Sequence, residues 1–188
     1  MNASNQVLDR PQPITNAPAS RPIAELQFAV AESSLGHVLV ARSDIGLCAV
    51  LLGDDAGQLQ RDLQERFPGA SLVDASQALG GLAAAVVQFI ESPTRGLDVP
   101  LDVRGTDFQR TVWRALRDIP AGSTASYSEV ANRIGNPKAV RAVAHACAAN
   151  TLAVVIPCHR VVTTEGKVSG YRWGVERKRA LLRREATV

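Results

Sequence analysis

Hydrophobic and polar positions alternate in short blocks along the first half of the chain. Apolar blocks at residues 26–30, 37–41 and 47–52 are separated by polar, glycine-containing stretches at 33–36 and 43–46. Short apolar runs bounded by such turn signals are typical of β-strands. The pattern therefore predicts a small antiparallel meander of three strands.

The remainder of this half predicts helices beside that sheet. Apolar side chains at every fourth position predict a helix over residues 57–67, which Pro68 ends. Residues 71–73 predict a further strand, and residues 79–90 predict a second helix with one apolar face. The N-terminal half is thus expected to be an α/β domain.

In the second half the hydrophobic period becomes helical. Thr106 is suited to cap a helix that runs to Arg117, with its large apolar side chains on one side. Ser126 and Glu129 have the spacing of a capping box, so they predict the start of another helix that runs towards Ile134. This half is therefore expected to be mainly α-helical.

The next helix is predicted from its local signals. Gly135 is suited to end the preceding helix, Asn136 to cap the next one, and Pro137 to occupy its first position, so the helix should cover residues 138–149. Two short helices joined by so tight a turn are a candidate helix-turn-helix. Antiparallel helix pairs in ordinary protein cores give the same pattern.

Helix 138–149 separates its two faces. Lys138, Arg141 and His145 share one face, while the opposite face is apolar and includes Cys147. The charged face is suited to phosphates, but it offers few side chains of the kinds that read base edges. We therefore expect sequence-independent binding to nucleic acid.

The most distinctive chemistry lies at Cys158 and His159. They follow the apolar run at residues 152–155, which predicts a buried strand or extended segment, and Pro157 ends that run. An imidazole can raise the thiolate fraction of a neighbouring thiol, although adjacent side chains on a strand need a turn or a bridging water to interact. A cysteine that only packs in the core is the alternative.

The last helix, predicted over residues 175–185, carries a further candidate. Glu185 shares the inward face with Leu181. A buried carboxylate needs a partner, and His159 is a candidate for it. Exposure of Glu185 at a frayed helix end is the other interpretation.

Charge divides the chain more sharply than its net value of +3 suggests. Residues 1–103 carry six arginines against twelve acidic residues, a net charge of −6, whereas residues 104–188 carry fifteen basic against six acidic residues, a net charge of +9. A basic half with a reactive cysteine favours a polyanionic partner, nucleic acid first. A solvated basic face is the alternative.

Composition excludes several classes. No apolar run approaches the ~20 residues that cross a membrane, and no secretory signal begins the chain, so we expect a cytoplasmic protein without membrane contact. Three cysteines with no CxxC spacing argue against a disulfide framework, and the three histidines show no metal-ligand spacing with them. Neither a metal nor a cofactor is expected.

We expect four segments along the chain. Residues 1–22 hold four of the ten prolines and should form a disordered lead-in. An N-terminal α/β domain should follow over residues 23–96, with a linker at 97–104. A basic domain that is suited to nucleic acid and carries the reactive cysteine should occupy residues 105–188.

One longer motif is far more specific than a Cys-His pair. The sequence PCHRVV at residues 157–162, with Asn150 eight residues before the cysteine, resembles the active-site signature of the O6-alkylguanine-DNA alkyltransferases. The resemblance covers roughly residues 105–186 and is strongest to the alkyltransferase half of the bacterial adaptive-response protein. Further matches follow in order at residues 105–109, 112–113, 119–122, 126–127, 135–139 and 169–174.

This resemblance implies a fold and a reaction. The fold is a ribonuclease-H-like α/β domain followed by a mainly α winged helix-turn-helix domain. The reaction is direct-reversal DNA repair, in which the alkyl group of O6-alkylguanine, and also of O4-alkylthymine, moves to Cys158 once the base has flipped out of double-stranded DNA. Because the protein is its own acceptor, each molecule acts once, as a monomer and without a cofactor.

The resemblance also assigns roles by position. Cys158 is the nucleophile, His159 the base acting through a water, Glu185 the residue that orients His159, and Asn150 the hinge between the recognition helix and the cysteine segment. Around them, Arg141 matches the finger that fills the gap left by the flipped base, and Tyr127 matches the residue that helps to rotate the target phosphate. The base pocket is formed by Cys147, Val161, Tyr171 and Arg172, and Trp173 replaces a glycine of the mammalian relatives.

Two other classes of protein fit part of this pattern. A winged helix-turn-helix regulator, or a lesion-binding protein without catalysis, would explain the basic half, but the presence of Cys158 favours transfer. A thiol hydrolase would also use a cysteine and a histidine. It would turn over repeatedly and would bind peptides or esters rather than DNA.

Overall fold

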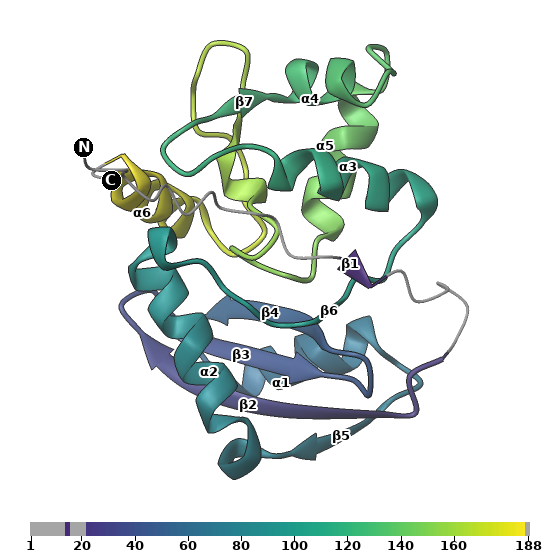
Figure 1. Ribbon diagram of the computed structural model, residues 1–188, viewed down its shortest axis with the longest axis vertical. Coiled ribbons are helices and arrows are strands. Elements are labelled where there is room, and N and C mark those ends of the chain that lie inside the picture. The colour runs from purple at the N-terminus through teal and green to yellow at the C-terminus, as the bar shows by residue number, and fades with distance from the viewer. Residues whose placement is uncertain (1–13, 16–21, 187–188) are drawn as a thin grey trace, which may run out of the picture.

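The computed structural model describes residues 14–15 and 22–186. Six strands within these residues form one sheet in the order β1-β6-β4-β3-β2-β5 (Figure 1). The pairs β2–β3 and β3–β4 are antiparallel, which confirms the predicted meander, and β5 adds to β2 in parallel. The strands are β1 (Ile14–Thr15), β2 (Glu25–Ser33), β3 (Gly36–Arg42), β4 (Leu47–Gly53), β5 (Ser71–Asp74) and β6 (Leu101–Asp102).

Two helices pack on this sheet, one in front of it and one behind it in Figure 1. They are α2 (Ser76–Glu91) and α1 (Ala56–Arg66), and a short 3-10 turn, η1 (Pro93–Arg95), follows α2. Leu63 of α1 and Val86 of α2 are fully buried against the strands. Both predicted helices are confirmed. In the described part of the chain, no helix combines the length and apolar character needed to cross a membrane.

Two segments differ from the expected domain plan. Residues 14–15, placed in the disordered lead-in, form β1 and pair with β6, while residues 1–13 and 16–21 lie outside the described residues. The expected linker at residues 97–104 contains β6, and the amide of Leu47 donates to the carbonyl of Pro100 at 2.8 Å. The linker expectation was wrong at these positions because the chain adds to the sheet edge before it leaves the sheet.

The second half is mainly helical, as predicted. Capping boxes at Thr106 and Ser126 begin its first two helices, because each hydroxyl accepts from the amide three residues later. A short parallel pair, β7 with β8, places the start of α4 beside the segment that follows Cys158. The elements are α3 (Asp107–Arg117), β7 (Ala125–Ser126), α4 (Tyr127–Arg133), α5 (Val140–Ala149), η2 (Cys158–Arg160), β8 (Val161–Val162) and α6 (Val175–Glu185).

The start of α5 corrects one prediction. Gly135 ends the previous helix with φ of 73°, as expected for a residue without a side chain. Asn136 does not cap α5, however, because its carbonyl accepts from the amide of Ala139 at 3.0 Å and closes a separate turn. The helix begins at Val140, so Lys138 lies in the preceding turn rather than on the helix.

The two halves are joined at two places. The segment after α5 lies along β4: the amide of Val50 donates to the carbonyl of Thr151 at 2.8 Å, and the amide of Ala153 donates to the carbonyl of Val50 at 2.9 Å. Helix α6 contacts the sheet half through Arg177 and Arg184. The segments on both sides of Cys158 are therefore held by the N-terminal half.

Candidate active site

The backbone leading to Cys158 is not the predicted strand. Leu152 makes one isolated bridge to Val50, and the chain then turns tightly. Val154 has φ of 66°, which is rare for a β-branched residue, and the amide of the next residue donates to the carbonyl of the previous one at 2.7 Å. The prediction failed because a buried turn has the same apolar composition as a buried strand.

A second tight turn positions the thiol itself. Pro157 has φ of −80° and ψ of 58°, and the amide of Cys158 donates to the carbonyl of Ile156 at 2.8 Å. This is the inverse γ-turn that proline's fixed φ favours. Cys158 then begins the 3-10 turn η2, so its side chain and that of His159 are not forced to opposite faces as they would be on a strand.

Asn150 connects helix α5 to the thiol. Its side-chain amide donates to the sulfur of Cys158 at 3.2 Å and to the carbonyl of Ile156 at 2.9 Å, while its side-chain oxygen accepts from the amide of Leu152 at 2.9 Å. The residue is fully buried at the C-cap of α5. Movement of residues 152–158 relative to α5 would therefore break hydrogen bonds of the Asn150 side chain.

The thiol of Cys158 is buried, with 4% of the residue exposed. Burial raises its pKa to about 11, and the hydrogen bond from Asn150 and the charge of Lys178 act in the opposite direction. A thiol with such a pKa is protonated at neutral pH. An effective nucleophile here requires a group that removes the proton when the electrophile arrives.

His159 and Glu185 form the predicted pair. The ring nitrogen Nε2 lies 2.8 Å from Oε1 of Glu185, and both side chains are buried. Burial lowers the pKa of His159, against the opposing effect of the carboxylate. The interpretation that Glu185 is frayed and exposed is excluded. The other ring nitrogen, Nδ1, is buried without a hydrogen-bond partner.

The carboxylate of Glu185 is also held by Arg160. Nε and Nη2 of the guanidinium donate to the two carboxylate oxygens at 3.0 and 2.9 Å. Burial alone would raise the pKa of Glu185, but the bonds from His159 and Arg160 outweigh it and lower the pKa to about 2. The carboxylate is therefore ionised, as a buried carboxylate with two donors should be.

Sequence reasoning missed two cations of this site. It gave no role to Arg160, although the residue lies within the PCHRVV motif, and none to Lys178, which lies on the predicted helix at residues 175–185. Lys178 is fully buried, and its ammonium donates to the carbonyl of Val161 at 2.5 Å. Its position seven residues before Glu185 on one helix face was the available signal.

Aromatic residues surround the same centre. The hydroxyl of Tyr127 lies 2.9 Å from that of Ser169, so α4 contacts the loop that precedes α6. Tyr171 packs edge-on against His159, with ring centroids 6.5 Å apart, and against Trp173 at 5.1 Å. Burial raises the pKa of Tyr171, and its hydroxyl has no partner. Trp173 itself is buried, so core packing accounts for its position.

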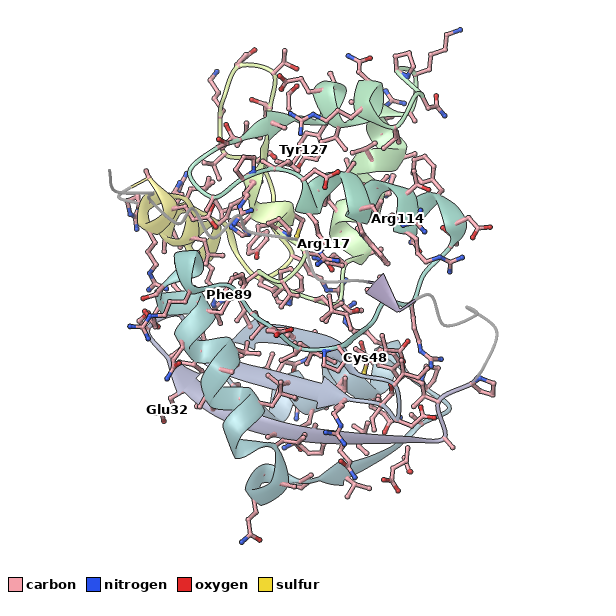
Figure 2. The ribbon with its side chains drawn as sticks, in the orientation of Figure 1. Glu32, Cys48, Phe89, Arg114, Arg117 and Tyr127 are labelled. Carbon is pink, nitrogen blue, oxygen red and sulfur yellow. The ribbon has the colours of Figure 1, made fainter. Side chains whose placement is uncertain are left out.

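The remaining predicted residues divide into two groups. Cys147 and Val161 are buried beside the thiol segment. Lys138, Arg141 and Arg172 are exposed on the surface, and Nη1 of Arg172 reaches the carbonyl of Ala148 at 3.3 Å. Figure 2 shows Tyr127 in the helical half, away from the sheet. The structure thus brings together the proposed chemical groups and leaves the proposed DNA contacts on the outside.

The chain is similar to known proteins. Residues 107–187 match the 6-O-methylguanine DNA methyltransferase DNA-binding domain. A methylated-DNA–protein-cysteine methyltransferase of Mycolicibacterium paratuberculosis is 37% identical over 157 residues, which are 84% of this chain and 90% of the relative. The chain belongs to the methylated-DNA–protein-cysteine methyltransferase family. The resemblance found in the sequence is confirmed.

Other members of this methyltransferase family agree over most of the chain. The bifunctional transcriptional activator/DNA repair enzyme Ada of Escherichia coli is 53% identical over 161 residues, which are 86% of this chain and 46% of Ada. The chain thus spans about half the length of that relative. The crystal structure of Mycobacterium tuberculosis OGT in complex with DNA is similar with a TM-score of 0.71 and 34% identity, covering 86% of this chain and 93% of that one.

Proposed function

We propose that this protein repairs alkylated DNA by direct reversal, moving the alkyl group of O6-alkylguanine, and of O4-alkylthymine, to the sulfur of Cys158. The observation that carries the proposal is one buried centre in which Asn150 contacts the thiol and Glu185 holds the neighbouring His159. Family membership and the relatives' names support the same reaction.

The protonation state of Glu185 supports the proposed role of His159 as the base. Because Glu185 is ionised and can only accept, Nε2 of the imidazole must carry the proton that it shares with the carboxylate. The unpartnered Nδ1 is then the acceptor that takes the proton of Cys158, through a bridging water. The carboxylate stabilises the imidazolium that forms, as an orienting group does for a base.

The reaction balances without a cofactor. The thiolate attacks the alkyl carbon, a sulfur–carbon bond forms, and the bond between that carbon and O6 breaks. The electron pair goes to the guanine, which takes up the proton that the thiol gave up and returns to its normal form. Cys158 becomes a stable thioether, so each protein molecule reacts once.

The target carbon cannot be reached inside a stacked duplex, so the base must flip out. We assign DNA binding to the exposed basic surface of Arg141 and Lys138, with Arg141 filling the gap and Tyr127 rotating the target phosphate. Helices α4 and α5, joined by the turn at Gly135, serve as the helix-turn-helix, and the loop at residues 163–170 serves as its wing. We assign the N-terminal half to the ribonuclease-H-like domain that the family resemblance implies.

The base pocket is assigned to side chains near the thiol. Cys147, Val161 and Tyr171 would line it, and Arg172 would lie at its mouth. The bulk of Trp173 disfavours large O6 substituents such as benzyl. We propose that the protein acts as a monomer on double-stranded DNA bearing O6-alkylguanine, in the cytoplasm, where its three free cysteines stay reduced.

The test is stoichiometric. The protein is incubated with a duplex that contains one O6-methylguanine, and its intact mass is measured. We expect a gain of one CH2 per molecule, located at Cys158 by peptide mapping, and no further turnover with excess DNA. Binding of the lesion without any mass gain would instead support a non-catalytic lesion-binding protein, and repeated turnover would support a hydrolase.

A further inference from the structure

Lys178 places a positive charge in the core. It is fully buried on the face of α6 that also carries Leu181 and Glu185. Its ammonium has three N–H groups and donates to the carbonyl of Val161. Burying an ammonium is costly unless an anion compensates it, so the location of its counter-charge has to be explained.

The nearby carboxylate is already committed. Both oxygens of Glu185 are taken by Arg160, and one of them also bonds to His159. Among the described residues, no carboxylate lies within ion-pair distance of the ammonium of Lys178. Arg160 and Glu185 neutralise each other, so Lys178 has no carboxylate partner among the described residues. Burial lowers the pKa of Lys178, and Cys158 and Cys147 act in the opposite direction.

Two thiols lie near this ammonium, and two phenols lie near the thiol of Cys158. Cys158 and Cys147 both interact with Lys178 electrostatically, and Tyr127 on α4 and Tyr171 before α6 interact with Cys158. Burial raises the pKa of both phenols, so they stay neutral near pH 7. Of the two thiols, Cys158 is the one that also receives a hydrogen bond, from Asn150.

We propose that Lys178 is the counter-charge of the Cys158 thiolate, a positioning residue that stabilises the ionised acceptor from the α6 side while Asn150 does so from α5. Three side chains then act together on the sulfur. His159 removes the proton, Asn150 donates a hydrogen bond, and Lys178 supplies the charge. The inference rests on the proposed function only in taking Cys158 as the acceptor.

The test separates charge from packing with three variants. Lys178→Met removes the charge and the donor, Lys178→Gln removes the charge but keeps an N–H for the carbonyl of Val161, and Lys178→Arg keeps the charge. The thiol pKa is measured without DNA from the pH dependence of thiolate absorbance, with Cys158→Ser subtracted. We expect Met and Gln to raise the pKa by about one unit, so that methyl transfer near pH 7 slows ~10-fold and recovers as pH rises, while Arg preserves both.

A purely structural role gives a different result. In that case Gln behaves like the wild type, Met slows transfer equally at every pH, and the thiol pKa does not move, which would overturn the proposal. If the variants do not fold, the wild-type protein with nitrogen-labelled lysine provides a second test. The Lys178 ammonium resonance should shift with the midpoint of the Cys158 titration and should lose that step in Cys158→Ser.

These measurements also separate the two proposals. If the thiol pKa depends on the charge at Lys178 but the protein gains no methyl group from DNA, the proposed function is contradicted and the role of Lys178 is supported. If methyl transfer occurs but the thiol pKa does not depend on the charge at Lys178, the proposed function is supported and the role of Lys178 is contradicted.

Discussion

Cys48 and Cys158 are both buried thiols, yet they lie in regions that are built in opposite ways. Cys48 sits on β4, where its sulfur donates to the carbonyl of Ala41 at 3.3 Å, and burial raises its pKa to about 12. Burial raises the pKa of Cys158 to about 11. Neither exposure nor pKa distinguishes a packing cysteine from the proposed acceptor.

The difference lies in the backbone around each thiol. In the sheet, the backbone amides and carbonyls are hydrogen-bonded to neighbouring strands, and the side chains of β4 are apolar. Around Cys158 two tight turns replace the ladder, and the side chains of Asn150 and Lys178 donate to the backbone carbonyls of Ile156 and Val161. Asn150 also donates to the sulfur, so a polar side chain contacts this thiol, whereas the sulfur of Cys48 donates to a backbone carbonyl.

The most direct test of this comparison is to replace each of the two cysteines in turn. Cys158→Ser should abolish methyl transfer from an O6-methylguanine duplex and leave DNA binding intact, because only the acceptor is lost. Cys48→Ala should transfer one methyl group per molecule at a wild-type rate and lose only about 1 kcal/mol of stability from the small cavity. Intact-mass measurements and urea unfolding check both. Transfer that persists in Cys158→Ser and disappears in Cys48→Ala would reverse the assignment.

The second largest effect is expected at the carboxylate. Glu185→Gln removes the charge that orients His159, and it leaves the buried guanidinium of Arg160 unpaired. We expect transfer to slow about 100-fold, since positioned proton transfer contributes at least that much, and stability to fall by about 3 kcal/mol. Single-turnover kinetics and thermal unfolding measure the two effects. An unchanged rate in a destabilised variant would make Glu185 structural only.

Alkaline pH should lower the free energy of unfolding through both thiols. Because burial raises the pKa of Cys48 to about 12 and of Cys158 to about 11, each folded thiol favours its protonated form. Each therefore contributes stability that is complete below the unfolded pKa near 8.5 and is lost as pH rises through the folded value. Urea unfolding from about pH 8 upward should show stability falling by up to about 1.4 kcal/mol per pH unit for each thiol. Cys48→Ala should reduce that slope, and an unchanged slope would contradict the sign.

The smallest effect is expected where the two halves meet. Nη1 of Arg184 donates to the carbonyl of Ile90 at 3.1 Å and lies 3.4 Å from Glu91, while Nε of Arg177 donates to the carbonyl of Leu35 at 2.7 Å. Partly exposed pairs of this kind contribute about 1 kcal/mol, so Arg184→Met should lower Tm by about 2–4 °C. Calorimetry of this variant beside Arg183→Met, which changes a neighbour on the same helix, tests the contact.

Local sequence signals predicted much of this fold. The capping boxes at Thr106 and Ser126 and the three-strand meander need only neighbours in the chain, and these predictions are confirmed. The start of α5 was wrong because Asn136 can cap a helix or close a turn, and only packing decides between them. The strand predicted at residues 152–155 was wrong because composition does not distinguish a buried turn from a strand.

The sequence predicted only part of the candidate site, because some of its contacts also depend on packing. The motif at residues 157–162 and the inward position of Glu185 named the proposed nucleophile, base and orienting carboxylate, and the structure shows the contact between His159 and Glu185. Arg160 and Lys178 had no predicted partner, because a bidentate contact to Glu185 and a bond to the carbonyl of Val161 depend on how α6 docks. The proposed DNA contacts at Arg141 and Tyr127 stay predictions.

The attachment of residues 151–153 to β4 has a consequence for the proposed acceptor once it is alkylated. These residues cover part of a strand edge that would otherwise present unpaired amides and carbonyls. An uncovered edge of this kind is a template for association with other chains. If an alkyl group on Cys158 moved this segment off β4, the exposed strand edge would favour association with other chains. The same few hydrogen bonds would then hold the segment of the proposed acceptor and keep the edge of β4 covered.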